Sequence, residues 1–370
     1  MTAGLTTETA LKEITEADME NIALGGAFLG TGGGGDPYIG KLMAIDAIKT
    51  HGPVSVIDVD SLDDDALVVP VAMMGAPTVM LEKLPRGNEA LKALKTLQEH
   101  LGKKADAVFC IEAGGLNSTI PLAVAAATGL PVVDGDAMGR AFPELQMVSM
   151  TLHGIRACPM IMADEKGNAI LLDAVDNSST EQFARPLTVE MGGSSLIALY
   201  PMTGAQAKLA TLRGSLSLIH SIGKIIRAEQ AANRPPAALL AETLDGFHLF
   251  EGRVVDIERK TEGGFARGEC RLVGMGSFTG RTLTLQFQNE FLMARTDDEK
   301  PVAMTPDLIS LLDLDTGEPI TTEAIRFGFR VLVFGLACDS QWRMPQGIAL
   351  VGPRYFGYEC DYQAIEELND

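Results

Sequence analysis

Acidic side chains at the ends of two predicted strands are the residues best placed to do chemistry. Asp134 and Asp136 follow a short apolar segment with Gly135 between them, and Glu112 follows another apolar segment. Two aspartates spaced in this way face the same cleft only where the chain leaves the regular strand, which glycine permits. Carboxylates held close together share a proton or bind a cation. The sequence therefore predicts Glu112, Asp134 and Asp136 as catalytic acid–base residues.

Each of these acids also has a structural alternative. One of the two aspartates can cap the segment that follows, which leaves only the other in the cleft. Glu112 precedes two glycines, so its carboxylate can instead accept hydrogen bonds from the backbone of that turn. Both alternatives stay open at the level of the sequence.

Three further side chains are predicted to bind a substrate. Asn117 offers a donor and an acceptor that match the polar edge of a ring, although it can equally cap the next helix. Arg140 is the single strong cation in this cluster, and it can steady a carboxylate or a developing oxyanion. Its alternative is an ion pair with Asp136 or Glu144. Glu82 is a weaker candidate at the end of another predicted strand.

Four consecutive glycines form the most unusual segment of the chain. They are Gly32, Gly33, Gly34 and Gly35. Each would destabilise a helix or strand interior by about 1 kcal/mol, so something must approach this backbone closely. Asp36 as N-cap and Pro37 as the first helical residue would direct N–H groups and a helix dipole at the loop. We predict that the loop faces a ligand, and a tight turn between helices is the alternative.

A divalent cation is compatible with this acidic cluster. Its predicted ligands are the oxygens of Asp36, Glu112, Asp134 and Asp136, and Zn²⁺, Mn²⁺ or Mg²⁺ are the candidate ions. The five histidines show no metal-binding spacing such as H-x-x-x-H. Purely organic acid–base chemistry is the alternative to a metal.

The composition narrows the class of protein. The 370 residues carry 49 Asp and Glu against 30 Lys and Arg, a formal charge of −19, which disfavours nucleic acid and anionic membranes as partners. Five scattered cysteines without a C-x-x-C pair suit a reducing compartment. The polar N-terminus does not resemble a signal peptide, and the longest apolar run, 66–81, contains two prolines. We expect a cytoplasmic protein that acts on a small molecule, and a homo-oligomer is possible.

The first part of the chain predicts an α/β domain over residues 1–170. Helices are predicted up to the glycine loop and from Pro37 to about residue 50. Apolar strands at 54–59, 66–72, 105–111 and 131–133 then alternate with helices at 86–101 and 119–128. This alternation is typical of a parallel sheet with helices on both faces, a three-layer arrangement. Ligands bind at the carboxyl ends of such strands, where the acidic residues lie.

The pattern changes in the second part, which we assign to a domain over residues 171–370. A hairpin at 160–172 precedes it, residues 186–200 are predicted to be extended, and 204–232 to form one long helix. Short strands follow over 246–350, including 252–259, 268–275, 282–291 and 330–336. Strands at this spacing favour a small barrel or a sandwich, so the C-terminal domain is predicted to be rich in β structure.

Four segments carry specific motifs. They are GTGGGGDPY at 30–38, EAGGLNS at 112–118, DGDAMGRAFPE at 134–144 and GPRYFGY at 352–358. Together they resemble the S-methyl-thiohydantoin desulfurase-like family, whose genes are often found beside hydantoinase genes. The resemblance implies an N-terminal three-layer α/β domain and a β-rich C-terminal domain. It also implies removal of sulfur from a thiohydantoin-type ring, which leaves a hydantoin.

The hypothesis is a hydrolase in which activated water attacks the ring carbon that bears sulfur. The acids would activate water or hold a metal, and the glycine loop, Asn117 and Arg140 would bind the ring. Two other hypotheses remain. The glycine loop could belong to a nucleotide- or phosphate-binding module, although it follows a helix and lacks the P-loop lysine. The chain could also be a non-catalytic partner of a hydantoinase.

Overall fold

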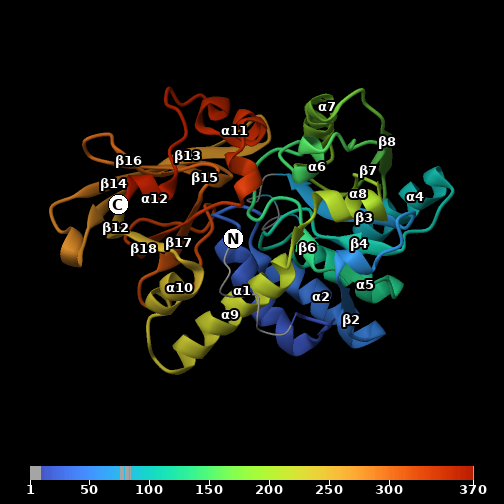
Figure 1. Cartoon of the computed structure of the whole chain (residues 1–370), viewed down its shortest axis with the longest axis horizontal. Helices are drawn as coiled ribbons and strands as arrows, with labels where there is room; N and C mark the ends of the chain where they lie inside the picture. The colour runs from blue at the N-terminus through green and yellow to red at the C-terminus, as the bar shows by residue number, and fades with distance from the viewer. Residues whose placement is uncertain (1–9, 76–78, 80–82, 84, 370) are drawn as a thin grey trace.

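The structure is a computed structural model that describes residues 10–75, 79, 83 and 85–369. Two large sheets organise it, and in Figure 1 they lie on opposite sides of the molecule. The first has nine strands and is surrounded by helices, and the second has seven antiparallel strands. A small sheet pairs β6 (Gly135–Asp136) with β11 (Leu212–Arg213). The predicted α/β part and β-rich part are therefore both present.

Four parallel strands form the centre of the first sheet, in the order β2-β5-β4-β3. They are β2 (Val54–Ile57), β3 (Leu67–Gly75), β4 (Ala107–Phe109) and β5 (Val132–Val133). The crossover helices are α4 (Glu89–Leu101) and α5 (Ile120–Thr128). Every residue of β3 up to Met74 is buried, because α5 packs on it and α7 and α8 also contact it. Apolar side chains on both faces of a strand are expected in such a covered sheet.

The strands predicted to be parallel are parallel, but antiparallel strands extend the sheet beyond β3. The whole sheet is therefore mixed. They are β9 (Ser194–Ala198), β7 (Met160–Ala163) and β8 (Ala169–Leu172), and β1 (Glu13–Ile14) and β10 (Met202–Thr203) pair elsewhere. The hairpin predicted at 160–172 is β7–β8. The extended segment predicted from residue 186 begins later, because α7 (Asn177–Glu190) occupies its first residues. The division into 1–170 and 171–370 stays a prediction.

The two N-terminal helices flank the glycine loop as predicted. They are α1 (Met19–Leu29) and α2 (Pro37–His51). The Asp36 side chain accepts a hydrogen bond of 2.8 Å from the backbone N–H of Tyr38, and Pro37 is the first helical residue. Upstream of α1, Thr15 and Asp18 form the capping box around a short 3₁₀ turn. The predicted start of α2 at Asp36 and Pro37 is therefore confirmed.

The single helix predicted over 204–232 is wrong. The segment contains α8 (Gly204–Ala210), the short strand β11 (Leu212–Arg213) and α9 (Ser215–Ala231). The helix breaks because β11 pairs with β6 (Gly135–Asp136) and Gly214 adopts a left-handed φ of 76°. The break places the first turn of α9 beside the predicted acidic cluster.

The second sheet has the order β16-β15-β14-β13-β12-β18-β17 and curls into a half-barrel. Its strands are β12 (Phe247–Glu262), β13 (Phe265–Gly274), β14 (Thr282–Gln288), β15 (Glu290–Thr296), β16 (Pro301–Met304), β17 (Leu308–Asp313) and β18 (Arg330–Leu336). Alternate side chains fill its apolar core, including Leu283, Leu285 and Phe287. The strand predicted over 282–291 is two strands, because Asn289 turns the chain with a φ of 59°.

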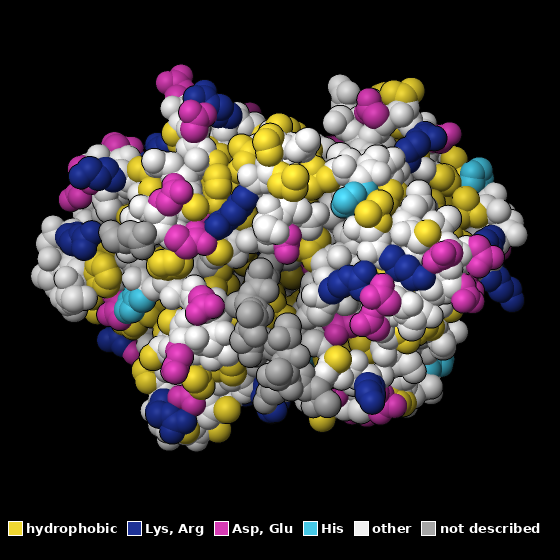
Figure 2. Space-filling model, viewed as in Figure 1, with side chains coloured by type: hydrophobic (Ala, Val, Ile, Leu, Met, Phe, Trp, Pro, Cys, Tyr) yellow, Lys and Arg dark blue, Asp and Glu magenta, His cyan; other side chains and the backbone are white. Residues whose placement is uncertain are grey.

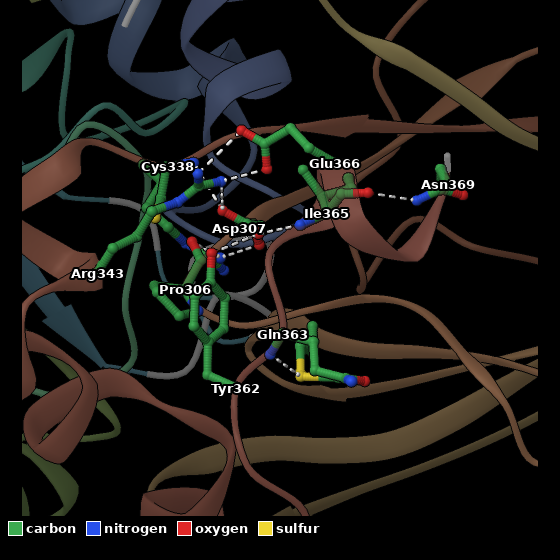
Figure 3. Close-up of polar contacts among 11 residues, drawn as sticks. Pro306, Asp307, Cys338, Arg343, Tyr362, Gln363, Ile365, Glu366 and Asn369 are labelled. Carbon is green, nitrogen blue, oxygen red and sulfur yellow. Dashed lines mark hydrogen bonds and ion pairs between the residues drawn. The ribbon is translucent and has the colours of Figure 1, made fainter.

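Short helices complete the structure. They are α6 (Ser149–Leu152), α10 (Ala237–Leu244), α11 (Pro345–Val351) and α12 (Ile365–Leu368). The buried carboxylate of Asp307, at the start of β17, fastens the C-terminal segment to the half-barrel (Figure 3). It accepts hydrogen bonds from Arg343, Tyr362 and the backbone of Ile365.

Two further features concern the charge on the surface and the length of the helices. On the face shown in Figure 2, basic side chains are mixed with acidic ones. Within the residues that the structure describes, we found no helix of the length and hydropathy needed to cross a membrane.

Candidate active site

A small cavity of about 60 Å³ lies where the loops at the carboxyl ends of β3 and β4 meet the start of β15. Apolar side chains of Met73, Ile111 and Phe142 form much of its wall. Six polar or charged residues also line it: Glu112, Asn117, Glu144, Arg185, Asn289 and Glu290. The cavity therefore lies between the two sheets and receives residues from both parts of the chain.

Glu112 lies in this cavity at the end of the segment that follows β4. Its side chain is 5% exposed, and burial raises the pKa of its carboxyl group to about 7. A hydrogen bond from Asn117 opposes the rise, and the nearby charge of Asp136 adds to it. A carboxyl group with a pKa near neutrality can both donate and accept a proton under physiological conditions. Glu112 thus lines the cavity, and its catalytic role stays a prediction.

Asn117 holds Glu112 in position. Its Nδ2 donates to Oε1 of Glu112 at 2.6 Å and to the carbonyl oxygen of Met73 at 3.2 Å. Its Oδ1 accepts a hydrogen bond of 2.7 Å from the backbone N–H of Met73. The amide is thus engaged on both sides by β3 and by Glu112, and it neither caps α5 nor offers a full edge to a ring.

Glu290, the first residue of β15, faces the same cavity from the second sheet. It is 3% exposed, and burial raises the pKa of its carboxyl group well above the usual value. The negative charge of Glu112 raises it further, while Arg140 and the backbone N–H of Gly34 oppose the rise. Its Oε2 has no hydrogen-bond partner among the described residues. Two buried carboxyl groups that repel one another favour a state in which one of them keeps a proton.

Other residues of the protein pack closely against the glycine loop. A Cβ atom on Gly33 would overlap with Oε1 of Glu290, and one on Gly34 would lie 2.7 Å from Cα of Gly114. Gly34 and Gly35 line the cavity, whereas Gly32 and Gly33 do not. The N–H of Gly33 donates to the carbonyl oxygen of Gly30, and the backbone of Gly34 lowers the pKa of the Glu290 carboxyl group. The loop therefore packs against Glu290, and the N–H of Gly33 is not available to a phosphate.

Arg140 lies behind the cavity and is fully buried. Its guanidinium donates five hydrogen bonds, and the acceptors are the carbonyl oxygens of Ala141, Pro306, Asp307 and Phe291 and the hydroxyl of Thr31. A guanidinium has five N–H donors, so each is accounted for. Burial lowers the pKa of Arg140 to about 10, which leaves it charged at neutral pH. Neither the predicted substrate contact nor an ion pair with Asp136 or Glu144 is formed.

The two aspartates do not share a cleft, and the capping alternative applies to both. Asp136 accepts hydrogen bonds from Ser215 Oγ at 2.6 Å and from the backbone of Met138 and Gly139. Asp134 accepts from the backbone N–H and the hydroxyl of Ser217. Both carboxylates therefore hold the first turn of α9, and neither lines the cavity. Burial raises the pKa of Asp136 to about 6 in spite of these three hydrogen bonds.

The predicted metal ligands are not brought together. Asp36 caps α2, Asp134 and Asp136 hold α9, and only Glu112 faces the cavity. Among residues 10–75, 79, 83 and 85–369, no three His, Cys, Asp or Glu side chains are grouped so that they could hold an ion. The predicted four-oxygen site is therefore not formed, and a divalent metal on other ligands stays a prediction. Glu82 lies outside the described residues.

Glu144 and Arg185 also line the cavity. Glu144 Oε2 accepts hydrogen bonds from the hydroxyl of Tyr355 at 2.7 Å and from Gln146 at 2.5 Å. The 352–358 segment thus returns to the cavity mouth through Tyr355. Its Arg354 instead pairs with Asp361 at the surface. Arg185 belongs to α7, which the sequence did not predict as a helix.

Glu290 and Arg185 are the two residues that sequence reasoning missed. Glu290 was assigned to the interior of one long strand, but the Gln-Asn-Glu sequence contained a usable signal. Asn tolerates positive φ, so Asn289 can mark a turn, and the side chain that follows it then points in a new direction. No comparable local signal identifies Arg185.

Comparisons with known proteins found two matching family models and a similar solved structure. Family models described as "S-Me-THD-like, N-terminal domain" and "S-Me-THD-like, C-terminal domain" match residues 17–174 and 175–365. A crystal structure of a protein from Chromobacterium violaceum is similar over 96% of this chain and 100% of that one, with a TM-score of 0.79 and 26% identity. A search of curated proteins gave no significant match.

Proposed function

Because the chain belongs to the S-Me-THD-like family, we propose that it is a hydrolase that removes sulfur from an S-methyl-thiohydantoin-like heterocycle. The observation that carries the proposal is the pair of buried carboxyl groups, Glu112 and Glu290, in one cavity. Their raised pKa values suit acid–base catalysis near neutral pH. The two acids are the basis for proposing hydrolysis by activated water.

The surroundings of the two carboxyl groups support different roles for them. Asn117 donates a hydrogen bond to Glu112, which favours its ionised form and suits it to act as the base. Glu290 has the stronger reason to stay protonated, because burial and the Glu112 charge both raise its pKa. Its Oε2, which has no partner among the described residues, can carry that proton toward a ring nitrogen. Glu290 is therefore the general acid.

The hydrolysis then balances over two steps. Glu112 takes a proton from water as the water oxygen bonds to the ring carbon that bears sulfur, and Glu290 protonates the adjacent ring nitrogen. The resulting tetrahedral adduct carries a hydroxyl and the methylthio group. Its hydroxyl proton returns to Glu290 as the C=O bond forms, the C–S bond breaks, and methanethiolate takes the proton from Glu112. Hydantoin and methanethiol leave, and both carboxyl groups regain their starting states.

Thiol release from S-methyl-thiohydantoin by the purified protein is the direct test. Thiol should appear in step with hydantoin, and reaction in H₂¹⁸O should place one ¹⁸O atom in the new carbonyl group. Absence of thiol release, or hydantoin without the label, would contradict hydrolysis at the carbon that bears sulfur. Metal analysis of the same preparation tests the separate prediction of a divalent ion.

A further inference from the structure

Two buried arginines lie near the cavity, and they differ in how many of their donors are used. Arg140 donates five hydrogen bonds to protein acceptors. Arg185 donates two: Nε to Oε1 of Glu181 at 2.6 Å and Nη2 to the carbonyl of Pro143 at 3.0 Å. Three of its five N–H groups, including both on Nη1, have no acceptor among the described residues.

The packing around Arg185 fixes the position of this cationic group. The residue is 8% exposed, and its guanidinium carbon lies 4.2 Å from the centre of the Phe265 ring. Glu181 is held in turn, because its Oε2 accepts a hydrogen bond of 3.0 Å from the backbone of Leu145. A guanidinium held by stacking and by an ion pair loses little side-chain entropy when it binds an anion.

The charged residues that line the cavity are of both signs. Glu112 and Glu290 are buried acids that would repel an anionic group. Among the described residues that line the cavity, Arg185 is the only cation. The third acid, Glu144, accepts hydrogen bonds from Tyr355 and Gln146. A ligand that is neutral where it meets Glu112 and Glu290 and anionic where it meets Arg185 matches this arrangement.

We propose that Arg185 is a specificity-determining residue that binds a carboxylate on the substituent of the heterocycle. The proposal rests on the proposed function for the identity of the ring, and it narrows the substrate class to rings with an acidic side chain. The carboxylate would accept hydrogen bonds from the unused N–H groups of Arg185, while the ring carbon that bears sulfur lies toward Glu112 and Glu290.

Two matched substrates test the proposal. One S-methyl-thiohydantoin carries a carboxymethyl group at the ring carbon, and the other carries the neutral, nearly isosteric carbamoylmethyl group. The wild-type protein should prefer the acid in kcat/KM. Arg185→Met should reduce kcat/KM for the acid by about 10- to 100-fold, mainly through KM, and change the amide by less than about threefold. Arg185→Lys should retain part of the preference, and Arg354→Met should retain all of it.

The outcomes separate this inference from the proposed function. Equal kcat/KM for both substrates in the wild-type protein would overturn the role of Arg185 and leave the hydrolase intact. If neither substrate releases thiol, the proposed function fails, and binding of hydantoin-5-acetic acid measured by calorimetry decides the role of Arg185. Saturable binding that is lost in Arg185→Met supports it, and no binding to the wild-type protein overturns it.

A folding defect would not obscure the result. Arg185→Met leaves Glu181 buried without its cation, which can destabilise the protein. The double variant Glu181→Gln/Arg185→Met removes both charges and keeps an acceptor for the backbone of Leu145. It should show the same loss of preference for the acid, and a retained preference would contradict the proposal.

Discussion

The carboxyl group of Glu290 occupies the space that a Cβ atom on Gly33 would need. The two residues are far apart in the sequence, because Gly33 lies in the loop between α1 and α2 and Glu290 begins β15. The glycine loop therefore packs closely against the carboxyl group of Glu290. This relationship explains why the loop contains bare backbone, and it makes the position of Glu290 testable.

A substitution at Gly33 should act through Glu290. Gly33→Ala is expected to lower stability and activity because the new methyl group displaces the carboxyl group, while the backbone φ of Gly33 is not in the left-handed region. In the Glu290→Ala variant, Gly33→Ala should lower the free energy of unfolding much less than it does in the wild-type protein. The free energy of unfolding of the four proteins gives the coupling, expected to be about 1–3 kcal/mol.

Gly129→Ala is the control for this cycle. Gly129 ends α5 with a φ of 70° and has no atom near its Cβ position, so substitution strains the backbone far from the cavity. Its effect should be the same with Glu or Ala at position 290. Additive effects of Gly33→Ala and Glu290→Ala would contradict the contact.

Removal of either acid should slow the reaction. Glu112→Gln and Glu290→Gln are each expected to reduce kcat by about 10²- to 10⁴-fold, the range of general acid–base catalysis. The wild-type kcat/KM should fall in acid as Glu112 gains a proton and fall in alkali as Glu290 loses one. Each variant should lack one limb of that profile, measured by thiol release between pH 5 and 9.

Asp136→Asn is the comparison for these variants. It replaces a carboxylate that accepts hydrogen bonds from Ser215 and two backbone N–H groups, so it should reduce stability more than the chemical step. Turnover unchanged in both Glu112→Gln and Glu290→Gln would remove the basis of the mechanism.

Burial of Glu112 should make the wild-type protein less stable as pH rises. The pKa of its carboxyl group is near 4.5 when exposed and about 7 in the folded protein. The folded state binds this proton more tightly than the unfolded state. The loss of stability caused by ionising buried Glu112 is therefore absent below about pH 4.5 and complete above about pH 7. Glu112→Gln should therefore gain stability relative to the wild type over this window, by roughly 3 kcal/mol at most. Chemical denaturation at several pH values measures the gain, and a difference that is independent of pH would contradict it.

Arg140 should contribute to stability far more than an exposed arginine. Arg140→Met leaves five acceptors without a donor, and Arg140→Lys cannot reach all of them, so each is expected to cost about 3–5 kcal/mol. Arg354, which is paired with Asp361 at the surface, is the matched control. Arg354→Met should change the free energy of unfolding by less than about 1 kcal/mol. Denaturant titration distinguishes the two positions, and equal effects would contradict the structural role of Arg140.

The sequence determined the local features of this protein. Asp18 and Asp36 mark helix starts because their carboxylates accept hydrogen bonds from backbone N–H groups only two or three residues away, those of Thr15 and Tyr38. Apolar runs identified the buried strands of the first sheet, and the motifs identified the family. Glu112 was recognisable as a cavity acid because it directly follows a buried segment. These properties depend on neighbours in the chain, so they can be read from it.

The tertiary structure alone decided which polar groups meet. Asp134, Asp136 and Arg140 have residue types suited to a substrate, but long-range contacts with α9 and the second sheet use their hydrogen-bonding capacity. Glu290 and Arg185 reach the cavity from distant parts of the chain. Among the described residues, Oε2 of Glu290 has no partner, and Arg185 uses two of its N–H groups. A buried polar group is available for chemistry only when the fold leaves it unpaired, and pairing across such separations is set by packing rather than by local sequence.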